Sequence, residues 1–388
     1  MSDLPDIADH RTPRWRPHPF RQFIIKTHSR CNLRCDYCYL YTMADQRWRT
    51  RPQTMAEQTL EYTAARIAEH ARAHNLPDVH IVLHGGEPLL AGPQRLERTI
   101  RTIQKAAGTQ TSFSIQTNGV LIDDEMLRLF ARLNVRVGVS LDGNASAHDR
   151  SRRGPRGGSH STVVAALRKL SGPEFRRQFG GLLCTIDLRN DPIETYETLL
   201  AFRPPSVDFL LPHGNWSTPP PGLDPRRRET PYAEWLIAIF DRWYRAARME
   251  TTIRFFEELM NVLLGGGSRI EGVGTSPAGM IVVETDGGIE QSDILSSTYP
   301  GAADLGLNVA TDTFDDAIRH PGTVVRQLRE DGVPTPCRPC RWSLVCGGGL
   351  YPHRYLTGQG FDRPSVYCHE LDHLISHVRA AMLADLTG

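Results

Sequence analysis

The sequence predicts an α/β protein whose parallel strands form an open or partial barrel, a partial (β/α)6 arrangement of the TIM-barrel type. Short apolar or β-branched runs alternate with helical patterns in the first half of the chain, as in βαβ units. Most of these runs are largely apolar or β-branched, which predicts strands buried on both faces. Six runs fit this description: 23–27, 79–83, 112–116, 135–140, 182–186 and 207–211.

The helices between these runs are predicted from signals at their ends. These signals are a capping-box pair, a glycine stop, an aspartate cap and an aspartate followed by proline. They are Thr54 with Glu57, Gly108, Asp123 or Asp124, and Asp191 with Pro192. A Pro/Gly-rich break at 212–230 precedes two further predicted helices, at about 232–248 and 255–264.

These patterns predict four segments in chain order. Residues 1–20 are expected to be a tail, 21–230 the barrel and 231–270 a pair of bridging helices. Residues 271–388 combine short β signals, many glycines and four cysteines. This composition predicts a small domain that a metal centre holds together.

Composition restricts the class of protein. The 388 residues carry a net charge of +1, so no overall attraction to nucleic acid or to an anionic membrane is expected. No apolar stretch is long enough to cross a membrane, and the polar N-terminus lacks the apolar core of a secretory signal. We therefore expect a cytoplasmic protein with reduced thiols, whose eight cysteines serve metal binding or catalysis.

The first cysteine group is Cys31, Cys35 and Cys38, directly after the first apolar run. In a parallel barrel this places three thiols at the carboxyl end of a strand, where active sites lie. Three thiolates on four irons leave one iron open to a small molecule. Zinc, with His28 nearby as a further ligand, is an alternative. A disulfide with a third free thiol suits a reducing compartment poorly.

Glycine-rich polar segments follow the next three apolar runs. They are His84–Pro88 (HGGEP), Gln116–Gly119 (QTNG) and Ser140–Gly143 (SLDG). Each segment alone could be only a turn or a helix cap. Together with the C-x3-C-x2-C spacing and an aromatic residue before the last cysteine, however, they resemble the motifs of radical S-adenosylmethionine (SAM) enzymes.

This resemblance implies a radical SAM barrel in which the first cysteine group ligates a 4Fe–4S cluster. It also implies that the glutamate and backbone of the HGGEP segment receive the amino group of SAM, while positions such as Ser140 and Arg152 hold its ribose or carboxylate. The implied SAM-binding residues are Tyr37, Gly85, Gly86, Glu87, Gln116, Asn118, Ser140, Asp142 and Arg152.

The second cysteine group has the spacing C-x2-C-x5-C and one later cysteine: Cys337, Cys340, Cys346 and Cys368. A structural zinc site with four cysteine ligands is the plain alternative. The pattern resembles the C-terminal SPASM domain of radical SAM peptide maturases, which usually holds two auxiliary 4Fe–4S clusters. The sequence departs from it at three ligand positions of one cluster, where it has Ser276, Ser292 and Leu350. We therefore expect a SPASM-like domain with one auxiliary cluster, ligated by all four cysteines.

Asp293 directly follows one of these missing ligands. In SPASM sulfatase maturases the matching aspartate is a general base, so the resemblance implies that Asp293 accepts a proton during catalysis. The alternative is a surface aspartate or a turn cap.

Other segments resemble the FxsB-type radical SAM/SPASM maturases, which form three-residue cyclophanes in ribosomal peptides. These segments are 26–30, 41–48, 211–216, 346–355 and 364–368. The resemblance implies a carbon–carbon bond between an aromatic ring and the Cβ atom of a residue two positions later. The implied partners are a precursor peptide and an electron donor such as flavodoxin or ferredoxin, with no nucleic acid and no membrane.

Three alternatives to a cyclophane synthase stay open. One is a dehydrogenase of the sulfatase-maturase kind, another a thioether-forming maturase, and the third a non-catalytic, zinc-stapled binding protein. Under the main hypothesis, His213, Asn215 and Trp216 could line the peptide site. His353 and Arg354 could do the same or hold the cluster loop, and Cys184 is expected to be an inert core residue.

Overall fold

We describe a computed structural model in which residues 15–387 are placed. The chain divides into two compact units, each of which joins segments that are distant in sequence. The barrel unit comprises Pro17–Leu183 and Gly279–Val324; the second unit comprises Cys184–Ala278 and Val325–Gly388, together with the start of the chain. The predicted four segments follow chain order instead, and their boundaries stay a prediction. Most of the predicted tail at 1–20 lies outside the described residues.

All six predicted apolar runs form strands. Within the barrel unit, five of them lie side by side in the order β8-β5-β4-β3-β1, and every pair in this series is parallel. Their bounds are β1 (Gln22–His28), β3 (Asp78–Gly85), β4 (Gln110–Thr117), β5 (Val135–Ser140) and β8 (Phe179–Thr185). The parallel order confirms the predicted fold class and brings the carboxyl ends of these strands to one edge.

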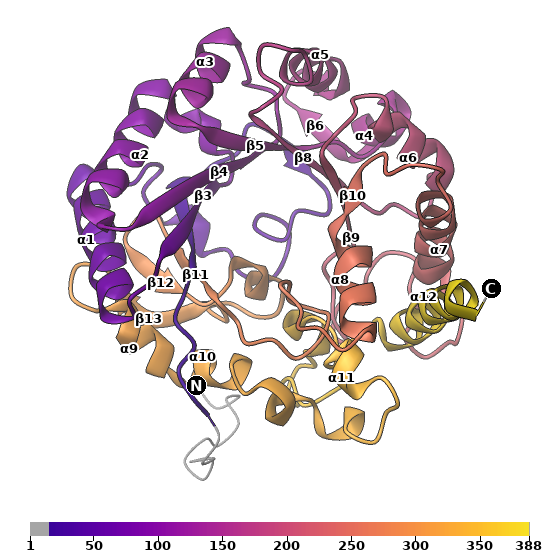
Figure 1. Cartoon of the computed structure of the whole chain (residues 1–388). Helices are drawn as coiled ribbons and strands as arrows, with labels where there is room; N and C mark the ends of the chain where they lie inside the picture. The colour runs from indigo at the N-terminus through magenta and orange to yellow at the C-terminus, as the bar shows by residue number, and fades with distance from the viewer. Residues whose placement is uncertain (1–14, 388) are drawn as a thin grey trace. The chain divides into compact units, whose positions relative to one another are not determined.

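Helices cover the outer side of this sheet in the barrel unit, and Figure 1 shows α1, α2 and α3 along strands β3, β4 and β5. These helices are α1 (Glu57–Ala73), α2 (Pro93–Ala107) and α3 (Asp124–Leu133), with α4 (Ala145–Ser151) and α5 (His160–Leu170) further along. Gly108 ends α2 with φ +65°, and Asp123 caps α3 by accepting a hydrogen bond from the Met126 N–H, as predicted. The predicted Thr54 capping box is wrong, because α1 begins after Ala56, which is extended and has no side-chain cap.

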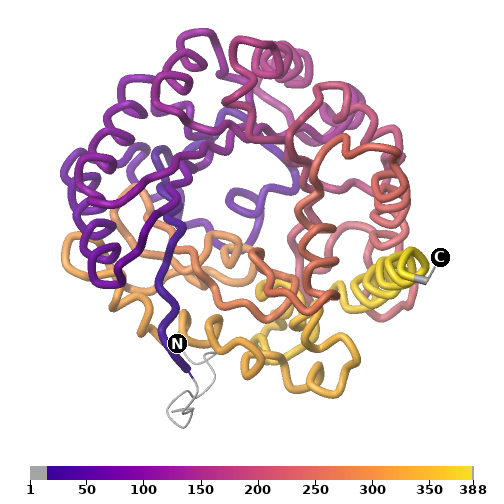
Figure 2. Tube along the Cα trace, in the orientation of Figure 1, coloured from indigo at the N-terminus to yellow at the C-terminus, as the bar shows by residue number. Residues whose placement is uncertain are grey.

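A later part of the chain returns to the barrel unit and extends its sheet. Strand β11 (Met280–Val283) pairs in parallel with β1, and β12 (Gly288–Glu290) and β13 (Asp304–Asn308) follow in antiparallel order. Figure 2 shows this late segment beside the N-terminal strand. The 3-10 helix η4 (Asp293–Ser297) and the helices α9 (Phe314–Arg319) and α10 (Pro321–Arg326) complete this region.

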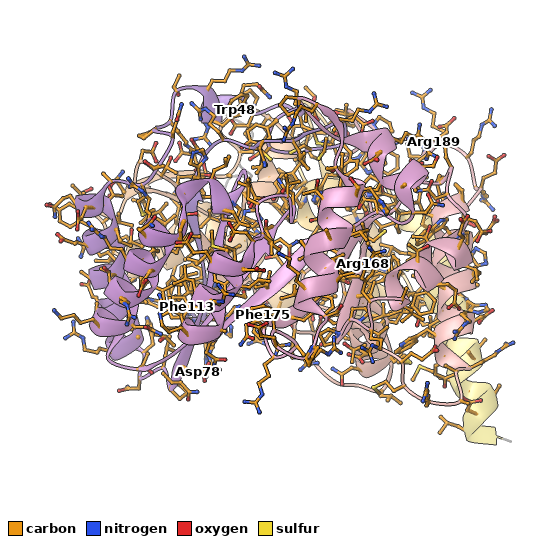
Figure 3. The ribbon with its side chains drawn as sticks, turned by 90° about the horizontal axis from the view of Figure 1, so that it is seen from above. Trp48, Asp78, Phe113, Arg168, Phe175 and Arg189 are labelled. Carbon is orange, nitrogen blue, oxygen red and sulfur yellow. The ribbon has the colours of Figure 1, made fainter. Side chains whose placement is uncertain are left out.

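The two edges of the barrel sheet carry different loops. In Figure 3, Trp48 and Asp78 are labelled at opposite edges: Trp48 lies in the 3-10 helix η2 (Arg47–Arg49), in the segment that leads from β1 to α1, and Asp78 is the first residue of β3. The edge with Trp48 is therefore the edge of the carboxyl ends, where the glycine-rich segments also lie.

A small antiparallel sheet, which the sequence did not predict, supports the first cysteine group. Its strands are β2 (Arg34–Cys35), β6 (Arg152–Gly154) and β7 (Gly157–Gly158), in that order. In this sheet Cys35 lies opposite Arg152.

The second unit holds the sixth predicted strand, β9 (Ser206–Leu210), paired in parallel with β10 (Thr252–Ile253). Its longer helices are α6 (Pro192–Leu200), α7 (Pro231–Tyr244), α8 (Arg254–Leu263) and α12 (Cys368–Thr387), and the short α11 (Ser343–Cys346) ends at a cysteine of the second group. Asp191 caps α6 and Pro192 occupies its first turn, as predicted, whereas α12 was not predicted. No helix in the described residues is long and apolar enough to cross a membrane.

Candidate active site

The three cysteines of the first group lie on one short loop of the barrel unit. Cys31 follows β1, Cys35 lies in β2, and Cys38 closes a turn by donating its backbone N–H to the Cys35 carbonyl at 3.2 Å. Burial raises the pKa of the Cys31 thiol to about 11 and that of the Cys35 thiol to about 12. Iron binds thiolates, so the binding of a cluster must offset the free-energy cost of deprotonating these buried thiols. Cluster binding is therefore expected to depend on pH.

The two glycines of the HGGEP segment let β3 approach this loop closely. A Cβ atom at Gly86 would lie 1.8 Å from the Tyr41 hydroxyl and 2.5 Å from the Arg30 carbonyl oxygen. The Gly86 N–H donates to the His28 carbonyl at 2.9 Å, and the Glu87 N–H donates to the Arg30 carbonyl at 2.9 Å. These two hydrogen bonds fix the backbone just before Cys31. An ammonium group has only hydrogen-bond donors, so an ammonium group bound here would need carbonyl or carboxylate oxygens as its partners.

Glu87 is buried, and its carboxylate organises the ends of β3 and β4. It accepts hydrogen bonds from the Thr117 hydroxyl at 2.6 Å, the Asn118 N–H at 2.8 Å and the Leu89 N–H at 3.0 Å. Burial nevertheless raises the pKa of Glu87 to about 7. A cationic ligand beside Glu87 would favour its ionised form.

Asn118 connects this carboxylate to the cysteine loop. Its side-chain amide lies 3.7 Å from the Cys31 sulfur, which also accepts the Leu33 N–H at 3.4 Å. Donors of this kind tune iron–sulfur clusters, so these contacts fit a cluster on Cys31.

The predicted SAM-binding residues after β4 and β5 lie in two small networks. The Gln116 amide donates to the Ser140 hydroxyl at 3.1 Å. The Arg152 Nε donates to the Asp142 carboxylate at 2.7 Å, and the Tyr37 hydroxyl donates to the same oxygen. Arg152 and Asp142 are both buried, and Arg152 stands over the Tyr37 ring. The structure therefore brings these residues beside the cysteine loop, while their binding roles stay a prediction.

Asp293 lies among polar side chains from three segments of the barrel unit. Its carboxylate forms an ion pair with the Lys26 ammonium and accepts the Tyr39 hydroxyl at 3.0 Å. The Lys26 ammonium also donates to His84 Nδ1 at 3.1 Å. Although burial opposes it, the Lys26 charge holds the pKa of Asp293 at about 2. Burial and the Lys26 charge lower the pKa of His84 to about 4, so at neutral pH this ring is uncharged.

A second acid lies near this group. Burial raises the pKa of Glu284 to about 7. Its carboxylate forms an ion pair with the Arg51 guanidinium at 2.9 Å. A cavity of about 30 Å³ is lined by Lys26, Glu284 and the two glycines of the HGGEP segment, enough for about one water molecule. A larger cavity of about 360 Å³, between α1 and α2, is lined by none of the predicted site residues.

Comparisons with known proteins agree with this geometry. The sequence profile of the Radical SAM superfamily matches residues 25–199. A serine-type anaerobic sulfatase-maturating enzyme of Bacteroides thetaiotaomicron is 35% identical over 376 residues, which cover 91% of this chain and 87% of the relative.

The chain belongs to the radical SAM superfamily. As a radical SAM enzyme it uses SAM and a 4Fe–4S cluster. A cysteine-type anaerobic sulfatase-maturating enzyme of Clostridium perfringens is 25% identical over 345 residues, covering 85% of this chain and 88% of the relative. The predicted superfamily is thus confirmed, whereas the FxsB-like subfamily stays a prediction.

Solved structures with the same fold include anSMEcpe with bound AdoMet, at a TM-score of 0.79 and 22% identity, covering 94% of this chain and 98% of that one. SuiB of Streptococcus suis matches at a TM-score of 0.59 and 16% identity, covering 90% and 77%. The structures of anSMEcpe with a Cp18Cys peptide and of SuiB with the precursor peptide SuiA also match.

In the second unit of this radical SAM enzyme, backbone hydrogen bonds join the segments that carry the second cysteine group. The Cys340 N–H donates to the Cys337 carbonyl at 3.0 Å, and the Gly349 N–H donates to the Cys346 carbonyl at 2.9 Å. The segment of Cys368 is joined to that of Cys346 by a bond from the Ser365 N–H to the Gly348 carbonyl at 3.2 Å. Within the second unit, four thiols thus converge from two distant parts of the sequence.

The spacing of the thiols bears on the choice between zinc and iron–sulfur. In the described part of the chain, no three thiols of either cysteine group lie within 4.8 Å of one another. Thiolates bound to one tetrahedral zinc ion lie about 3.8 Å apart, since each Zn–S bond is about 2.3 Å. Neither group has its thiols drawn together to the spacing of a single zinc ion, and the assignment of iron–sulfur clusters continues to depend on the sequence motifs.

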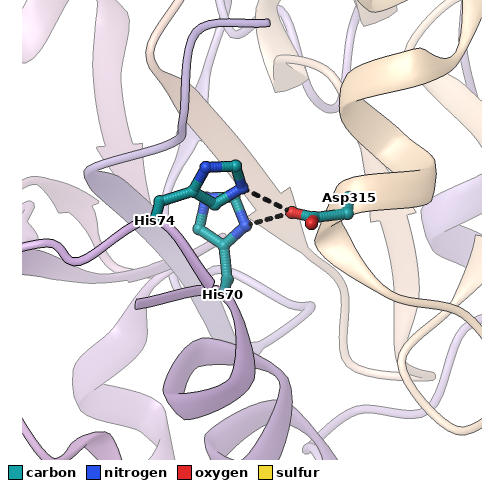
Figure 4. Close-up of side chains that lie close together, drawn as sticks. All are labelled: His70, His74 and Asp315. Atoms are coloured by element: carbon teal, nitrogen blue, oxygen red, sulfur yellow. Dashed lines mark hydrogen bonds and ion pairs between the residues drawn. The ribbon is translucent and has the colours of Figure 1, made fainter. Parts of the chain in front are cut away.

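In the described residues, one group has ligand atoms close enough for a single metal ion: His70, His74 and Asp315, shown in Figure 4. One Asp315 oxygen lies 2.8 Å from His70 Nδ1 and 2.8 Å from His74 Nε2. However, the backbone N–H of Phe20 donates to His70 Nε2 at 3.0 Å. His70 Nε2 is therefore an acceptor and Nδ1 carries the proton. A metal ion on Nδ1 would require the opposite tautomer, so this group is a hydrogen-bonded clamp.

The sequence analysis missed the partners of Asp293 in this radical SAM enzyme. Lys26 is a lysine inside the first apolar run, a position where a charge needs a buried partner, and this was an available signal. His84 is the first residue of the HGGEP segment and Tyr39 directly follows Cys38, but no sequence pattern connects them with Asp293. Cys184 is buried in β8, as expected for a core residue.

Proposed function

We propose that this radical SAM enzyme oxidises one residue of a polypeptide at its Cβ atom, as a peptide maturase. The observation that carries the proposal is the position of Asp293. Its carboxylate accepts a hydrogen bond from Tyr39, the residue directly after Cys38. A proton acceptor therefore contacts the residue that follows a proposed cluster ligand, and a substrate that has lost a hydrogen atom there must next lose a proton.

When bound, SAM and its cluster supply a 5′-deoxyadenosyl radical that removes one hydrogen atom from the substrate. The residues of this chain hold these groups and the substrate in position. Cys31, Cys35 and Cys38 would ligate the cluster. The buried carboxylates of Glu87 and Asp142, with Arg152, would hold the polar parts of SAM.

The acceptor role suits the electrostatics of Asp293. With its pKa at about 2, the carboxylate is ionised at neutral pH and ready to take a proton. Lys26, which is buried, keeps it ionised and fixes its orientation. Since the substrate carbon has already lost a hydrogen atom, the proton to be removed is far more acidic than in the starting residue, and a weak base suffices.

The oxidation also releases one electron, which needs an acceptor. We assign this role to one auxiliary 4Fe–4S cluster on Cys337, Cys340, Cys346 and Cys368. Four cysteines leave no open iron, so this cluster would accept electrons and would not bind substrate. By the resemblance to SPASM domains, Ser276, Ser292 and Leu350 stand at three of the ligand positions that a second auxiliary cluster would need.

Sulfatase-type oxidation is the first candidate within this proposal, because the curated relatives named above are sulfatase-maturating enzymes. In this reaction a serine or cysteine side chain loses one hydrogen atom from Cβ, one proton from its oxygen or sulfur, and one electron. The product is an aldehyde or thioaldehyde, and no new carbon–carbon bond forms.

Cyclophane formation is the second candidate, favoured by the FxsB-like segments and by the three absent cluster ligands. In this case the Cβ radical adds to an aromatic ring two residues earlier. The ring then loses one proton and one electron, which restores its aromaticity. Both candidates use the same base and the same electron acceptor.

Two peptide panels separate the candidates. The anaerobically loaded enzyme is given SAM, dithionite and peptides with a serine or cysteine target, or peptides with an aromatic residue two before its partner. Both reactions lower the initial product mass by two hydrogens. Hydrazide trapping identifies an aldehyde, whereas a cyclophane suppresses fragmentation inside its ring. If SAM cleavage modifies no peptide but consumes a small molecule, the proposal is wrong.

The Asp293→Asn variant tests the base directly. We expect it to cleave SAM to 5′-deoxyadenosine at a rate near that of the wild type while forming at least tenfold less product. The conservative Asp293→Glu variant should recover part of the product yield. Equal product yields for the wild type and the Asn variant would remove Asp293 from the reaction.

A further inference from the structure

Arg354 binds the loop that follows Cys346, in the second unit. It is the last residue of η7 (Tyr351–Arg354) and is only 8% exposed. Its Nη2 donates to the carbonyls of Gly347 and Gly349, both at 2.7 Å, and its Nε donates to Gly349 at 3.2 Å. Its Nη1 lies 3.4 Å from the Gly332 carbonyl. The guanidinium thus holds two carbonyls of the loop next to a cluster cysteine.

This loop has little freedom to move. Gly347, Gly348 and Gly349 have φ values of +61°, +83° and +73°, which favour glycine. A Cβ atom at Gly347 would lie 1.9 Å from the Gly274 carbonyl oxygen, and one at Gly348 would lie 3.2 Å from the Arg354 guanidinium carbon. The loop and the arginine are therefore packed against each other without room for a side chain.

The charge of Arg354 has no carboxylate partner. Its hydrogen bonds all go to backbone carbonyls, and within the described residues no carboxylate oxygen lies within 4 Å of it. Glu271, which borders the same cavity of about 70 Å³, forms an ion pair with Arg326, a second buried arginine. The carboxylate of Glu271 is thus already paired with another buried cation. An uncompensated buried charge is strongly destabilising, so an anion is expected beside Arg354.

The candidates for that anion beside this loop are the cysteine sulfurs. Cys346 directly precedes Gly347, whose carbonyl the guanidinium binds at 2.7 Å. Cys337 donates its N–H to the Pro334 carbonyl at 2.8 Å, and Pro334 packs against Gly348 of the same loop. Four thiolates on an oxidised 4Fe–4S core give a formal net charge of about −2. Such a centre would supply the missing anion.

We propose that Arg354 is the built-in counter-cation of an anionic 4Fe–4S centre on Cys337, Cys340, Cys346 and Cys368, and that its charge raises the reduction potential of this centre. The inference rests on the auxiliary cluster of the proposed function. Reduction adds one negative charge to the centre, and a fixed cation in a buried site stabilises the reduced state more than the oxidised one. A higher potential makes the centre a better acceptor for the electron released by the substrate.

The experiment separates the charge of Arg354 from its role as a loop brace. Arg354→Gln removes the charge but keeps amide donors for the carbonyls, whereas Arg354→Lys keeps the charge with fewer donors. Both are made in full-length protein with Cys31, Cys35 and Cys38 changed to alanine, so that only the auxiliary centre remains. Each protein is reconstituted anaerobically with iron and sulfide and titrated with reductant, and the reduced cluster is followed by electron paramagnetic resonance.

We expect the potential of the Gln variant to shift to more negative values, while that of the Lys variant stays near the parent protein. Arg341→Gln is the matched control, because Arg341 adjoins Cys340 but is 67% exposed and paired with Asp372 at 3.0 Å. Its potential should not change. If the Gln variant takes up no iron while the Lys variant takes up a full set of about four, the charge is again supported.

Other results overturn the inference in distinguishable ways. A Gln variant with the parent potential, or Gln and Lys variants that lose iron equally, would mean that Arg354 only braces the loop. This would leave the auxiliary cluster and the maturase proposal intact. A parent protein that binds about one zinc ion and no iron would instead refute the cluster itself, and the inference with it.

Discussion

Lys26 in β1 and Asp293 in η4 form an ion pair across 267 positions of the sequence. Both side chains are almost fully buried, at 3% and 8% exposure. Tyr39 and His84 add hydrogen bonds to the carboxylate and the ammonium, respectively. A buried pair with its remaining donors and acceptors satisfied is tolerable, whereas either charge alone is not. The buried charge of the proposed base, Asp293, is therefore compensated by a residue of strand β1, and the reverse is also true.

The Lys26→Met variant should lose stability and shift the pH profile of product formation. Removing the ammonium leaves Asp293 buried without a counter-charge, which costs about 3–5 kcal/mol. The pKa of Asp293 should rise from about 2, so the protonated, inactive form appears at higher pH. Product formation should therefore fall off at a higher pH than in the wild type as the solution is acidified. Denaturant unfolding and a pH–rate profile measure the two effects.

A double variant provides the control. Lys26→Met with Asp293→Asn has no buried charge left to compensate, so it should be more stable than Lys26→Met alone. If the double variant is the less stable of the two, the ion pair does not have the energetic role described here.

Changing Cys31, Cys35 and Cys38 to alanine should abolish SAM cleavage and halve the iron content. The wild type should hold about eight irons per chain and the variant about four. Iron analysis and chromatography of 5′-deoxyadenosine measure these outcomes. Any remaining SAM cleavage by the variant would contradict the assignment of these thiols to the SAM cluster.

The Gly86→Ala variant should displace the cysteine loop. Its new methyl group would occupy space taken by Tyr41 and the Arg30 carbonyl, and a backbone carbonyl cannot turn aside as a flexible side chain can. We expect destabilisation of at least ~2 kcal/mol and reduced iron content. The matched control is Gly279→Ala, whose Cβ atom would come no closer than 3.5 Å to a neighbour. Equal iron content in the two variants would show that the close approach at Gly86 is dispensable.

The clamp of His70, His74 and Asp315 predicts a loss of stability in acid and no response to zinc. Burial lowers the pKa of His70 below its usual 6.5. The unfolded chain therefore binds the proton more readily, and stability falls as the pH drops below about 6.5. The His70→Gln variant, which can still accept the Phe20 N–H and donate to Asp315, should lose this part of the pH dependence, as measured by thermal unfolding between about pH 5 and 7.

Zinc gives the opposing test of the same clamp. Because the Phe20 bond requires an acceptor at His70 Nε2, one equivalent of zinc should not raise the melting temperature of the iron-loaded protein. A rise in melting temperature that disappears in the His74→Gln variant would mean that the group is a metal site.

Much of the barrel could be predicted from local sequence. The six apolar runs became strands, as predicted, and in β1 every residue after Gln22 is buried, as expected for a strand covered on both faces. In β3, β4 and β5 buried side chains alternate with partly exposed ones, so the prediction of two buried faces is wrong for these strands. The starts of the helices after Asp123 and Asp191 could also be predicted from nearby residues alone, since an aspartate side chain caps the N–H groups of its own helix. The Thr54 capping box failed because a neighbouring residue, Ala56, begins the helix without any side-chain cap.

The sequence also carried the motifs whose resemblance predicts iron–sulfur clusters on the cysteine groups, because ligand type and spacing narrow the choice of metal centre. The tertiary structure alone decided which charges meet. It joined Lys26 to Asp293 by returning β11 to the side of β1, and it left Arg354 buried against the carbonyls after Cys346. A buried charge needs a partner that compensates it, and the fold decides which residue that is. Neither separation along the chain nor residue type identifies the partner from the sequence.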